Sequence, residues 1–142
     1  MRRCIALLVL AACAAPAATP RQVLDVTGID YAYAAPDTVA AGEAEIAFHN
    51  AGTVMHEVKL IALRPGVDLA TVLPLARVDT GWAAYREPTS GILTARPGET
   101  TPGRLLVTFE TGRHYLLICH FADTDDAPLH SELGMAKVLV AR

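Results

Sequence analysis

Residues 55–62 read Met-His-Glu-Val-Lys-Leu-Ile-Ala, and this stretch decides the class of fold that we expect. Side chains alternate between the two faces of an extended strand, so every second residue lies on the same side. Glu57, Lys59 and Ile61 share one face. The other face carries an imidazole followed by apolar side chains: His56, Val58, Leu60 and Ala62. The pattern predicts a strand with one buried face and a histidine at its apolar end.

Other short segments repeat this alternation. Residues 45–49 place Ile46 and Phe48 on one face, and residues 105–110 alternate in the same way. Residues 116–119 are continuously apolar, which is typical of a central strand covered on both faces. Further strands are expected at 23–30, 31–33 and 136–141. Short strands separated by turn residues predict one all-β domain over residues 23–142, a Greek-key β-sandwich of about seven or eight strands.

One short helix is expected beyond residue 67. Asp68 can cap its first turn, Leu69, Val72 and Leu73 lie on one side of it, and Pro74 limits its length. Residues 81–91 show no periodicity and contain the only tryptophan, Trp82. This second segment is therefore expected to be a packed loop.

The composition excludes several functions. The chain has 142 residues, 52% of them hydrophobic, and a net charge of −3, which suits one domain with a substantial core. Lysine and arginine are scattered and form no basic patch for nucleic acid, and no apolar run reaches the ~18 residues of a spanning helix. The chain has no Cys-x-x-Cys, no Gly-rich phosphate loop and no Gly-x-Ser-x-Gly. A carrier or binding protein is therefore expected rather than an enzyme.

Residues 1–13, MRRCIALLVLAAC, indicate export. Arg2 and Arg3 precede a short apolar stretch and then small residues, which is the layout of a secretory signal peptide rather than of a buried core segment. Ordinary signal cleavage near Ala18 is one reading of this region.

The preferred reading is a lipoprotein signal. Residues 10–13, Leu-Ala-Ala-Cys, resemble the bacterial lipobox, which implies a signal peptide at 1–12 and diacylation of Cys13. Acyl chains on Cys13 would hold the domain at a membrane surface. Residues 13–22 are rich in Ala, Pro and Thr and predict a flexible tether. Ala14 stands where an aspartate would retain a lipoprotein in a Gram-negative inner membrane, so the outer membrane is expected in such an organism.

Four side chains near expected strand ends could bind one metal ion: His56, Cys119, His130 and Met135. They combine a thiolate, two imidazoles and a thioether. Two histidines and a cysteine with a weak axial methionine form the ligand list of a blue-copper electron-transfer site, because the mixture of soft sulfur and nitrogen suits both oxidation states of copper. The alternatives are an ordinary buried thiol at Cys119, core packing of Met135 and a histidine satisfied by hydrogen bonds at position 56.

The three cysteines cannot all pair with one another. Cys4 falls in the expected signal segment and Cys13 is the expected lipid anchor. Cys119 is then the only free thiol of the mature domain. A lone thiol in an oxidising compartment is a liability unless it is buried or bound to metal, which favours a metal ligand.

Three segments resemble the cupredoxins, the blue type 1 copper family that includes plastocyanin and azurin. Residues 50–57, Asn-Ala-Gly-Thr-Val-Met-His-Glu, are similar to the first ligand loop of that family. Residues 112–119, Gly-Arg-His-Tyr-Leu-Leu-Ile-Cys, are similar to the strand that leads to the copper cysteine, and residues 130–135, His-Ser-Glu-Leu-Gly-Met, to its His-x₄-Met ending. The resemblance spans roughly residues 40–142. It implies a cupredoxin-like sandwich with one type 1 copper ion on these four side chains.

The sequence departs from this pattern in two places. Ten residues separate Cys119 from His130, whereas small electron carriers of the family usually have only a few. The intervening stretch is acidic and must fold back to bring His130 to the metal. Glu57 stands where an asparagine commonly joins the two ligand loops, and an ionised glutamate accepts hydrogen bonds without donating them.

The remaining histidines and the acidic loop are expected to lie apart from the metal. His120 follows Cys119 and should point to the opposite face of the strand, so it is a poor ligand for the same ion. The other side chains are expected to face solvent, with a hard cation or a basic partner as the alternative for the three aspartates: His49, His114, Asp123, Asp125 and Asp126.

The expected function is a lipid-anchored, extracytoplasmic electron carrier with one copper ion and an unknown redox partner protein. The electron is expected to leave through an exposed edge of His130, beside a docking patch of Leu129, Leu133 and Trp82. Without the anchor the protein would be soluble in the periplasm. Two alternatives stay open: a copper-binding module for delivery or tolerance that holds Cu(I) without redox turnover, and a metal-free cupredoxin-like interaction domain.

Overall fold

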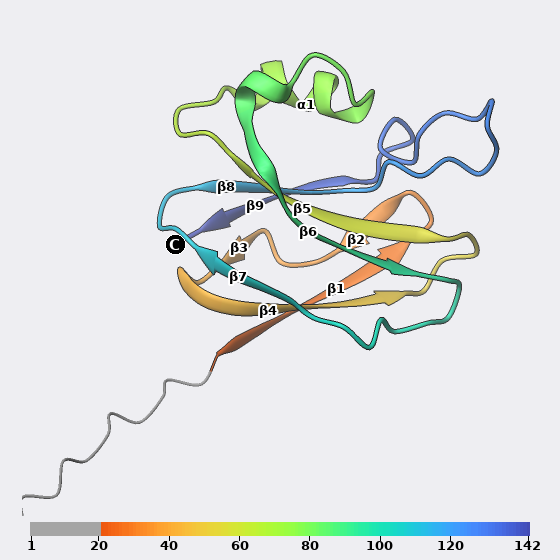
Figure 1. The fold of residues 1–142 in the computed structure, drawn as a ribbon, viewed down its shortest axis with the longest axis horizontal. Coiled ribbons are helices and arrows are strands. Elements are labelled where there is room, and N and C mark those ends of the chain that lie inside the picture. The colour runs from red at the N-terminus through yellow and green to blue at the C-terminus, as the bar shows by residue number, and fades with distance from the viewer. Residues whose placement is uncertain (1–20) are drawn as a thin grey trace, which may run out of the picture.

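The computed structural model describes residues 21–142, which form two packed β-sheets (Figure 1). The four-stranded sheet has the order β2 (Ala32–Ala34), β1 (Gln22–Ile29), β4 (Gly42–Asn50) and β7 (Leu105–Phe109). The five-stranded sheet has the order β3 (Thr38–Val39), β9 (Ala136–Ala141), β8 (His114–Ile118), β5 (His56–Leu63) and β6 (Arg86–Ala95). The expected signal peptide, Cys13 and most of the tether lie outside the described residues. Strand β1 already includes Gln22, the last residue of that expected tether.

Both sheets are mixed. Strands β1 and β4 pair in parallel, as do β3 and β9, and the other neighbours are antiparallel. The expected all-β sandwich is confirmed, with nine strands in the described chain, of which β3 and β6 were not expected.

The core between the sheets follows the alternation of β5. Val58 and Leu60 are fully buried there, against Ile46 and Phe48 of β4 in the opposite sheet. Strand β8 is covered on both sides, as expected from its continuous apolar run. Leu117 and Cys119 lie in the core between the sheets, whereas Leu116 and Ile118 belong to a second apolar cluster on the outer face.

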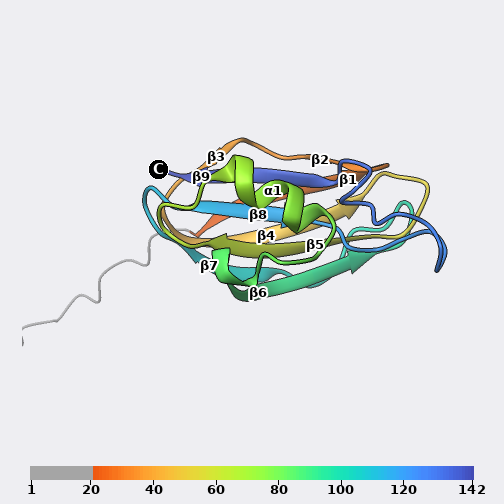
Figure 2. The same cartoon turned by 90° about the horizontal axis from the view of Figure 1, so that it is seen from above.

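Helix α1 (Leu69–Arg77) covers that outer face of the five-stranded sheet (Figure 2). The Asp68 side chain caps it by accepting a hydrogen bond from the Ala70 nitrogen at 3.1 Å, as expected. The expectation that Pro74 would limit the helix was wrong, because the helix continues through Pro74 to Arg77. Proline removes one backbone hydrogen bond. Burial of Val72 and Ala76 against the sheet offsets that loss.

Residues 81–91 are only partly a loop. A short 3₁₀ helix, η1 (Ala83–Tyr85), is followed at Arg86 by strand β6, so the expectation of a loop was wrong for residues 86–91. Strand β6 is an edge strand that pairs with β5 across two register shifts. Its first residues are mostly exposed on both faces, which explains the missing alternation in the sequence.

Three connections meet at one end of the sandwich (Figure 1): the β1–β2 turn, the β4–β5 loop and the long β8–β9 loop. This end therefore gathers segments that lie far apart in the sequence. Within residues 21–142, no helix is long and apolar enough to cross a membrane.

Candidate metal centre

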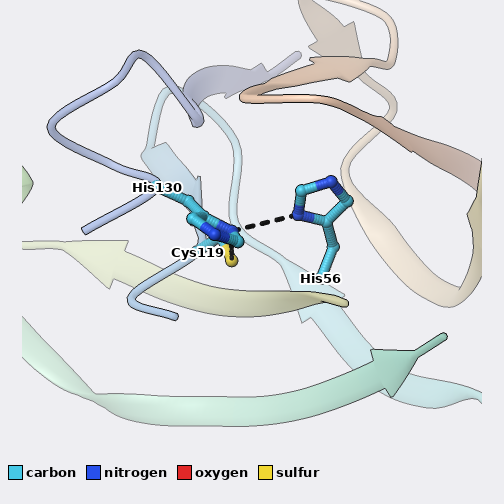
Figure 3. A group of neighbouring side chains, drawn as sticks. All are labelled: His56, Cys119 and His130. Atoms are coloured by element: carbon cyan, nitrogen blue, oxygen red, sulfur yellow. Dashed lines mark hydrogen bonds between the residues drawn. The ribbon is translucent and has the colours of Figure 1, made fainter. Parts of the chain in front are cut away.

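His56, Cys119 and His130 come together at the end of the sandwich where these loops meet (Figure 3). His56 is the first residue of β5, Cys119 directly follows β8, and His130 lies in the β8–β9 loop. One ligand atom from each residue lies within 4.8 Å of the others, and all three side chains are buried. The structure thus assembles three of the four expected ligands into one cluster.

The spacing of the donor atoms suits a single metal ion. The Nδ1 atoms of His56 and His130 are 3.1 Å apart, and Cys119 Sγ is 3.4 Å from His130 Nδ1. Metal–nitrogen bonds are about 2.0–2.1 Å and metal–sulfur bonds about 2.3 Å for an ion such as zinc. Two ligand atoms of one such ion can therefore be at most about 4 Å apart, and both separations satisfy this bound.

The outer nitrogens of both imidazoles contact carboxylates. His56 Nε2 lies 3.2 Å from Asp30 Oδ1, and His130 Nε2 lies 3.0 Å from Asp123 Oδ1. A carboxylate only accepts hydrogen bonds, so an imidazole that donates to it through Nε2–H leaves the lone pair of its Nδ1 free for a metal ion. Two lone pairs facing each other at 3.1 Å repel unless a cation lies between them. The arrangement fits a bound metal ion.

Burial tunes the protonation of the cluster. It raises the pKa of the Cys119 thiol to about 11, so the thiol keeps its proton unless a cation stabilises the thiolate. Burial also lowers the pKa of His56, against the opposing effect of Asp30, and so favours the neutral imidazole that a metal requires. Hydrogen bonds from Thr53 lower the pKa of Asp30 to about 2, and a hydrogen bond from Tyr31 lowers that of Asp123.

The long spacing between Cys119 and His130 does not separate them, because backbone hydrogen bonds close the base of the loop. The nitrogen of His130 donates to the Phe121 carbonyl at 2.7 Å, and that of Ser131 donates to the Cys119 carbonyl at 2.9 Å. The Met135 nitrogen in turn donates to His130 at 2.8 Å. Residues 122–129 therefore form an excursion between two ends that backbone hydrogen bonds hold together.

Two buried polar side chains hold the other ligand loop. Asn50 donates to the carbonyls of Val54 at 2.8 Å and Ala95 at 2.9 Å, and its Oδ1 accepts from the Gly52 nitrogen at 2.9 Å. Glu57 Oε1 accepts from the backbone nitrogen of His120 at 2.9 Å. Glu57, which stands where the family commonly has an asparagine, thus also joins the two loops, as a hydrogen-bond acceptor.

Met135 is fully buried beside this cluster. Its carbonyl accepts a hydrogen bond from the Cys119 nitrogen at 3.1 Å. Its methyl group lies against Gly28, where an added Cβ would be 3.3 Å from Met135 Cε and 3.1 Å from a ring carbon of Phe48. Its backbone is therefore tied to the ligand loop, and its role as axial ligand stays a prediction.

His120 points away from the cluster, as its strand position predicts. Its ring lies on the outer side of the sheet, where Nε2 is 3.0 Å from the Ala76 carbonyl and Nδ1 is 3.3 Å from Asp79. His49 contacts Thr100 at 3.0 Å, and both His49 and His114 are half-buried rather than fully exposed.

One expectation about the loop was incomplete and another was wrong. Asp123 is exposed, as expected, but its side chain also contacts His130 and the Tyr31 hydroxyl. His130 was expected to present an exposed edge, yet it is only 1% exposed. Of the expected docking patch, Trp82 is buried in the outer cluster under α1, whereas Leu133 is 46% exposed. The physical reason is the closed base of the loop, which draws His130 inward and leaves Asp123 over its outer edge.

Asp30 and Tyr31 were missed at the level of sequence. Asp30 is 26 residues from His56, and Tyr31 is 92 residues from Asp123, so no local pattern connects these pairs. The sequence pattern gave no signal for this turn, because residues 23–30 and 31–33 were both expected to be strands.

No family model and no curated protein matches the chain. Solved structures do resemble it. A dithionite-reduced auracyanin from Roseiflexus castenholzii is 18% identical, with a TM-score of 0.53 over 88% of this chain and 99% of that one. Auracyanin B is 20% identical, with a TM-score of 0.54 over 88% and 91% of the two chains. Auracyanin A of Chloroflexus aurantiacus, described as a "blue" copper protein, is 18% identical, with a TM-score of 0.52 over 87% and 100%.

These likenesses show the fold. The chain has the cupredoxin β-sandwich that residues 50–57, 112–119 and 130–135 led us to expect.

Proposed function

We propose that the protein binds one copper ion through His56, Cys119 and His130 and carries single electrons. The observation that carries this proposal is the convergence of two imidazole Nδ1 atoms and one thiol on a single point of a cupredoxin fold. Bound copper would supply a one-electron couple, for which this mixture of nitrogen and sulfur donors is suited. The auracyanin A structure, that of a "blue" copper protein, supports the same reading.

The chain's own residues favour electron transfer over catalysis. His56, Cys119 and His130 are buried, so they exclude water and leave little room for a substrate to bind the metal. Asn50 holds one ligand loop by a buried hydrogen bond, and Glu57 joins the two loops by a partly buried one. A site that hardly moves when its charge changes transfers electrons with little reorganisation.

The test is the copper content and visible spectrum of the purified protein. We expect one copper per chain and an intense blue thiolate-to-Cu(II) band, both lost in Cys119→Ser. The control His49→Ala, a half-buried histidine outside the cluster, should keep both. A blue band that survives in Cys119→Ser would contradict the ligand assignment, and copper content near zero in the unmodified protein would favour a metal-free interaction domain.

The alternative is a module that holds Cu(I) for delivery or tolerance. Voltammetry separates the two functions. Reversible cycling between oxidation states supports the electron carrier, whereas a site that cannot be cycled supports delivery or tolerance. Complete burial of the three ligands favours a metal that stays in place.

We further propose that the protein works outside the cytoplasm, anchored by acyl chains on Cys13. The lipobox-like residues 10–13 support this. Mass spectrometry of the N-terminal peptide should find a diacylated Cys13 as the first residue, and Cys13→Ala should release the protein from the membrane fraction. An unmodified terminus near Ala18 would indicate an ordinary periplasmic protein.

The redox partner is proposed to dock at a hollow beside the metal cluster. Its lining includes Thr53, Val54, Met55, Pro97, Phe121, Ala122 and Asp123. Met55 is 44% exposed there, and the nearby Asp125 and Asp126 are exposed and acidic. An apolar centre with an acidic side fits a partner with basic groups around an apolar patch. Electron exchange with a cationic inorganic oxidant should therefore slow with added salt, which screens the acidic side, and in Met55→Lys, which adds a positive charge to the hollow. An exchange rate that neither added salt nor the substitution changes would contradict this docking site.

A further inference from the structure

Asp30, Tyr31 and Asp123 lie together on the outer side of the two histidine rings, and we call them the carboxylate cap. Each aspartate contacts the Nε2 atom of one imidazole, at 3.2 Å for His56 and 3.0 Å for His130. The Tyr31 hydroxyl donates to Asp123 Oδ2 at 2.6 Å. The cap therefore reaches both imidazoles from the β1–β2 turn and the β8–β9 loop.

Tyr31 is held over both rings. Its ring stands edge-on to His130 with centroids 5.1 Å apart, and to His56 with centroids 6.4 Å apart. Tyr31 has a φ of 60°, which is uncommon for a bulky side chain. An unfavourable backbone persists only where the surrounding structure holds it, and such residues gather at functional sites.

The Asp30 half of the cap is equally ordered. Thr53 donates to Asp30 through its backbone nitrogen and its hydroxyl, both at 2.7 Å. Gly52 passes so close that an added Cβ would overlap Asp30 Oδ1 and lie 2.8 Å from His56 Nε2. The loop before His56 is thus shaped to let this carboxylate reach the imidazole.

We propose that the carboxylate cap consists of positioning residues, which hold both imidazoles with Nδ1 directed at the metal and keep solvent away from it. Asp30 and Asp123 select the Nε2–H tautomer of each ring, since that tautomer alone donates to them. Tyr31 covers the gap between the rings. The two negative charges also favour the more positive oxidation state of a metal ion in the site. This inference rests on the proposed copper function.

The first test needs no metal. Nitrogen-detected NMR of the metal-free protein at neutral pH should show His56 and His130 in the Nε2–H form. Asp123→Ala should shift His130 towards Nδ1–H, and Asp30→Ala should do so for His56. The matched control is Asp125→Ala, which removes an exposed aspartate of the same loop and should change neither ring. Histidines that stay in the Nε2–H form in both cap variants would overturn the proposal.

The second test uses the protein loaded with copper. Removing such outer hydrogen-bond partners typically costs 10–100-fold in metal affinity, so Asp123→Ala, Asp30→Ala and Gly52→Ala should release Cu(II) to a chelator about that much more readily. Asp123→Asn and Asp30→Asn keep an acceptor oxygen but remove a negative charge, so they should raise the reduction potential. Unchanged release and potential would overturn the proposal. Cap-dependent tautomers in a protein that binds no copper would instead reject the copper function alone.

Discussion

Glu57 and His120 are joined by a partly buried hydrogen bond that links the two ligand loops. Glu57 Oε1 accepts from the His120 nitrogen at 2.9 Å, although the two residues are 63 positions apart. The same oxygen lies 3.0 Å from Lys59 Nζ. Since His120 directly follows Cys119, this single carboxylate ties the thiol to the strand that carries His56.

Replacing Glu57 should therefore weaken both the fold and the site. Glu57→Ala leaves the His120 N–H without its partner in a partly buried place, which should lower the free energy of unfolding by about 1–3 kcal/mol. Glu57→Gln keeps an acceptor and should lose less. Denaturant titration of the metal-free protein measures both. Glu43→Ala, whose side chain is 70% exposed, is the matched control, and an equal loss in that variant would refute the role of Glu57.

Met135 can be tested as axial ligand without disturbing the core. Met135→Leu nearly conserves volume, so the free energy of unfolding should fall by less than about 1.5 kcal/mol. If the thioether is a ligand, its loss should shift the reduction potential and the visible spectrum of the copper-loaded protein. A variant that matches the unmodified protein in both would show that Met135 only packs.

The positive φ at Tyr31 should make the stability of the protein depend on which residue replaces the tyrosine. Tyr31→Asn and Tyr31→Val both remove the ring, but asparagine tolerates a φ of 60° far better than a β-branched residue does. The valine variant should be less stable than the asparagine variant by about 1–2 kcal/mol in denaturant titration. Equal stabilities would mean that the turn relaxes, and the strain argument would fail.

Asp68, the N-cap residue of α1, should make the free energy of unfolding depend on pH at low pH. Hydrogen bonds from Thr71 and Ala70 lower the pKa of Asp68 in the folded protein. The ionised Asp68 side chain therefore contributes fully to the free energy of unfolding above its unfolded-state pKa of about 3.9. This contribution is lost as the pH falls through the lower pKa of the folded protein. Asparagine also caps but does not titrate.

The measurement for Asp68 is the difference in free energy of unfolding between the unmodified protein and Asp68→Asn, taken as a function of pH. The difference should change in favour of the variant as the pH drops below about 4. The exposed Asp126→Asn serves as control. A pH-independent difference for Asp68→Asn would refute the assignment.

Local periodicity was sufficient for the centre of the fold. The alternation in residues 55–62 placed His56 inward with Val58 and Leu60, between the sheets. The expectation of a single buried face was wrong, because Glu57 and Ile61 on the other face of β5 are buried as well. The continuous apolar run at 116–119 predicted a strand covered on both sides, and Cys119 is fully buried. Patterns of period two report burial directly, because they depend on which face of a strand meets the core.

The tertiary structure decided what depends on distant neighbours. Strand β6 begins at Arg86 because β5 offers it a free edge, and α1 continues past Pro74 because the sheet buries its apolar side. The closed loop base that buries His130, and the carboxylates of Asp30 and Asp123 on the two imidazoles, join residues with no shared local pattern. The amino-acid sequence thus determined which side chains could bind a metal, and only the packing of distant loops determined how those side chains are oriented and shielded.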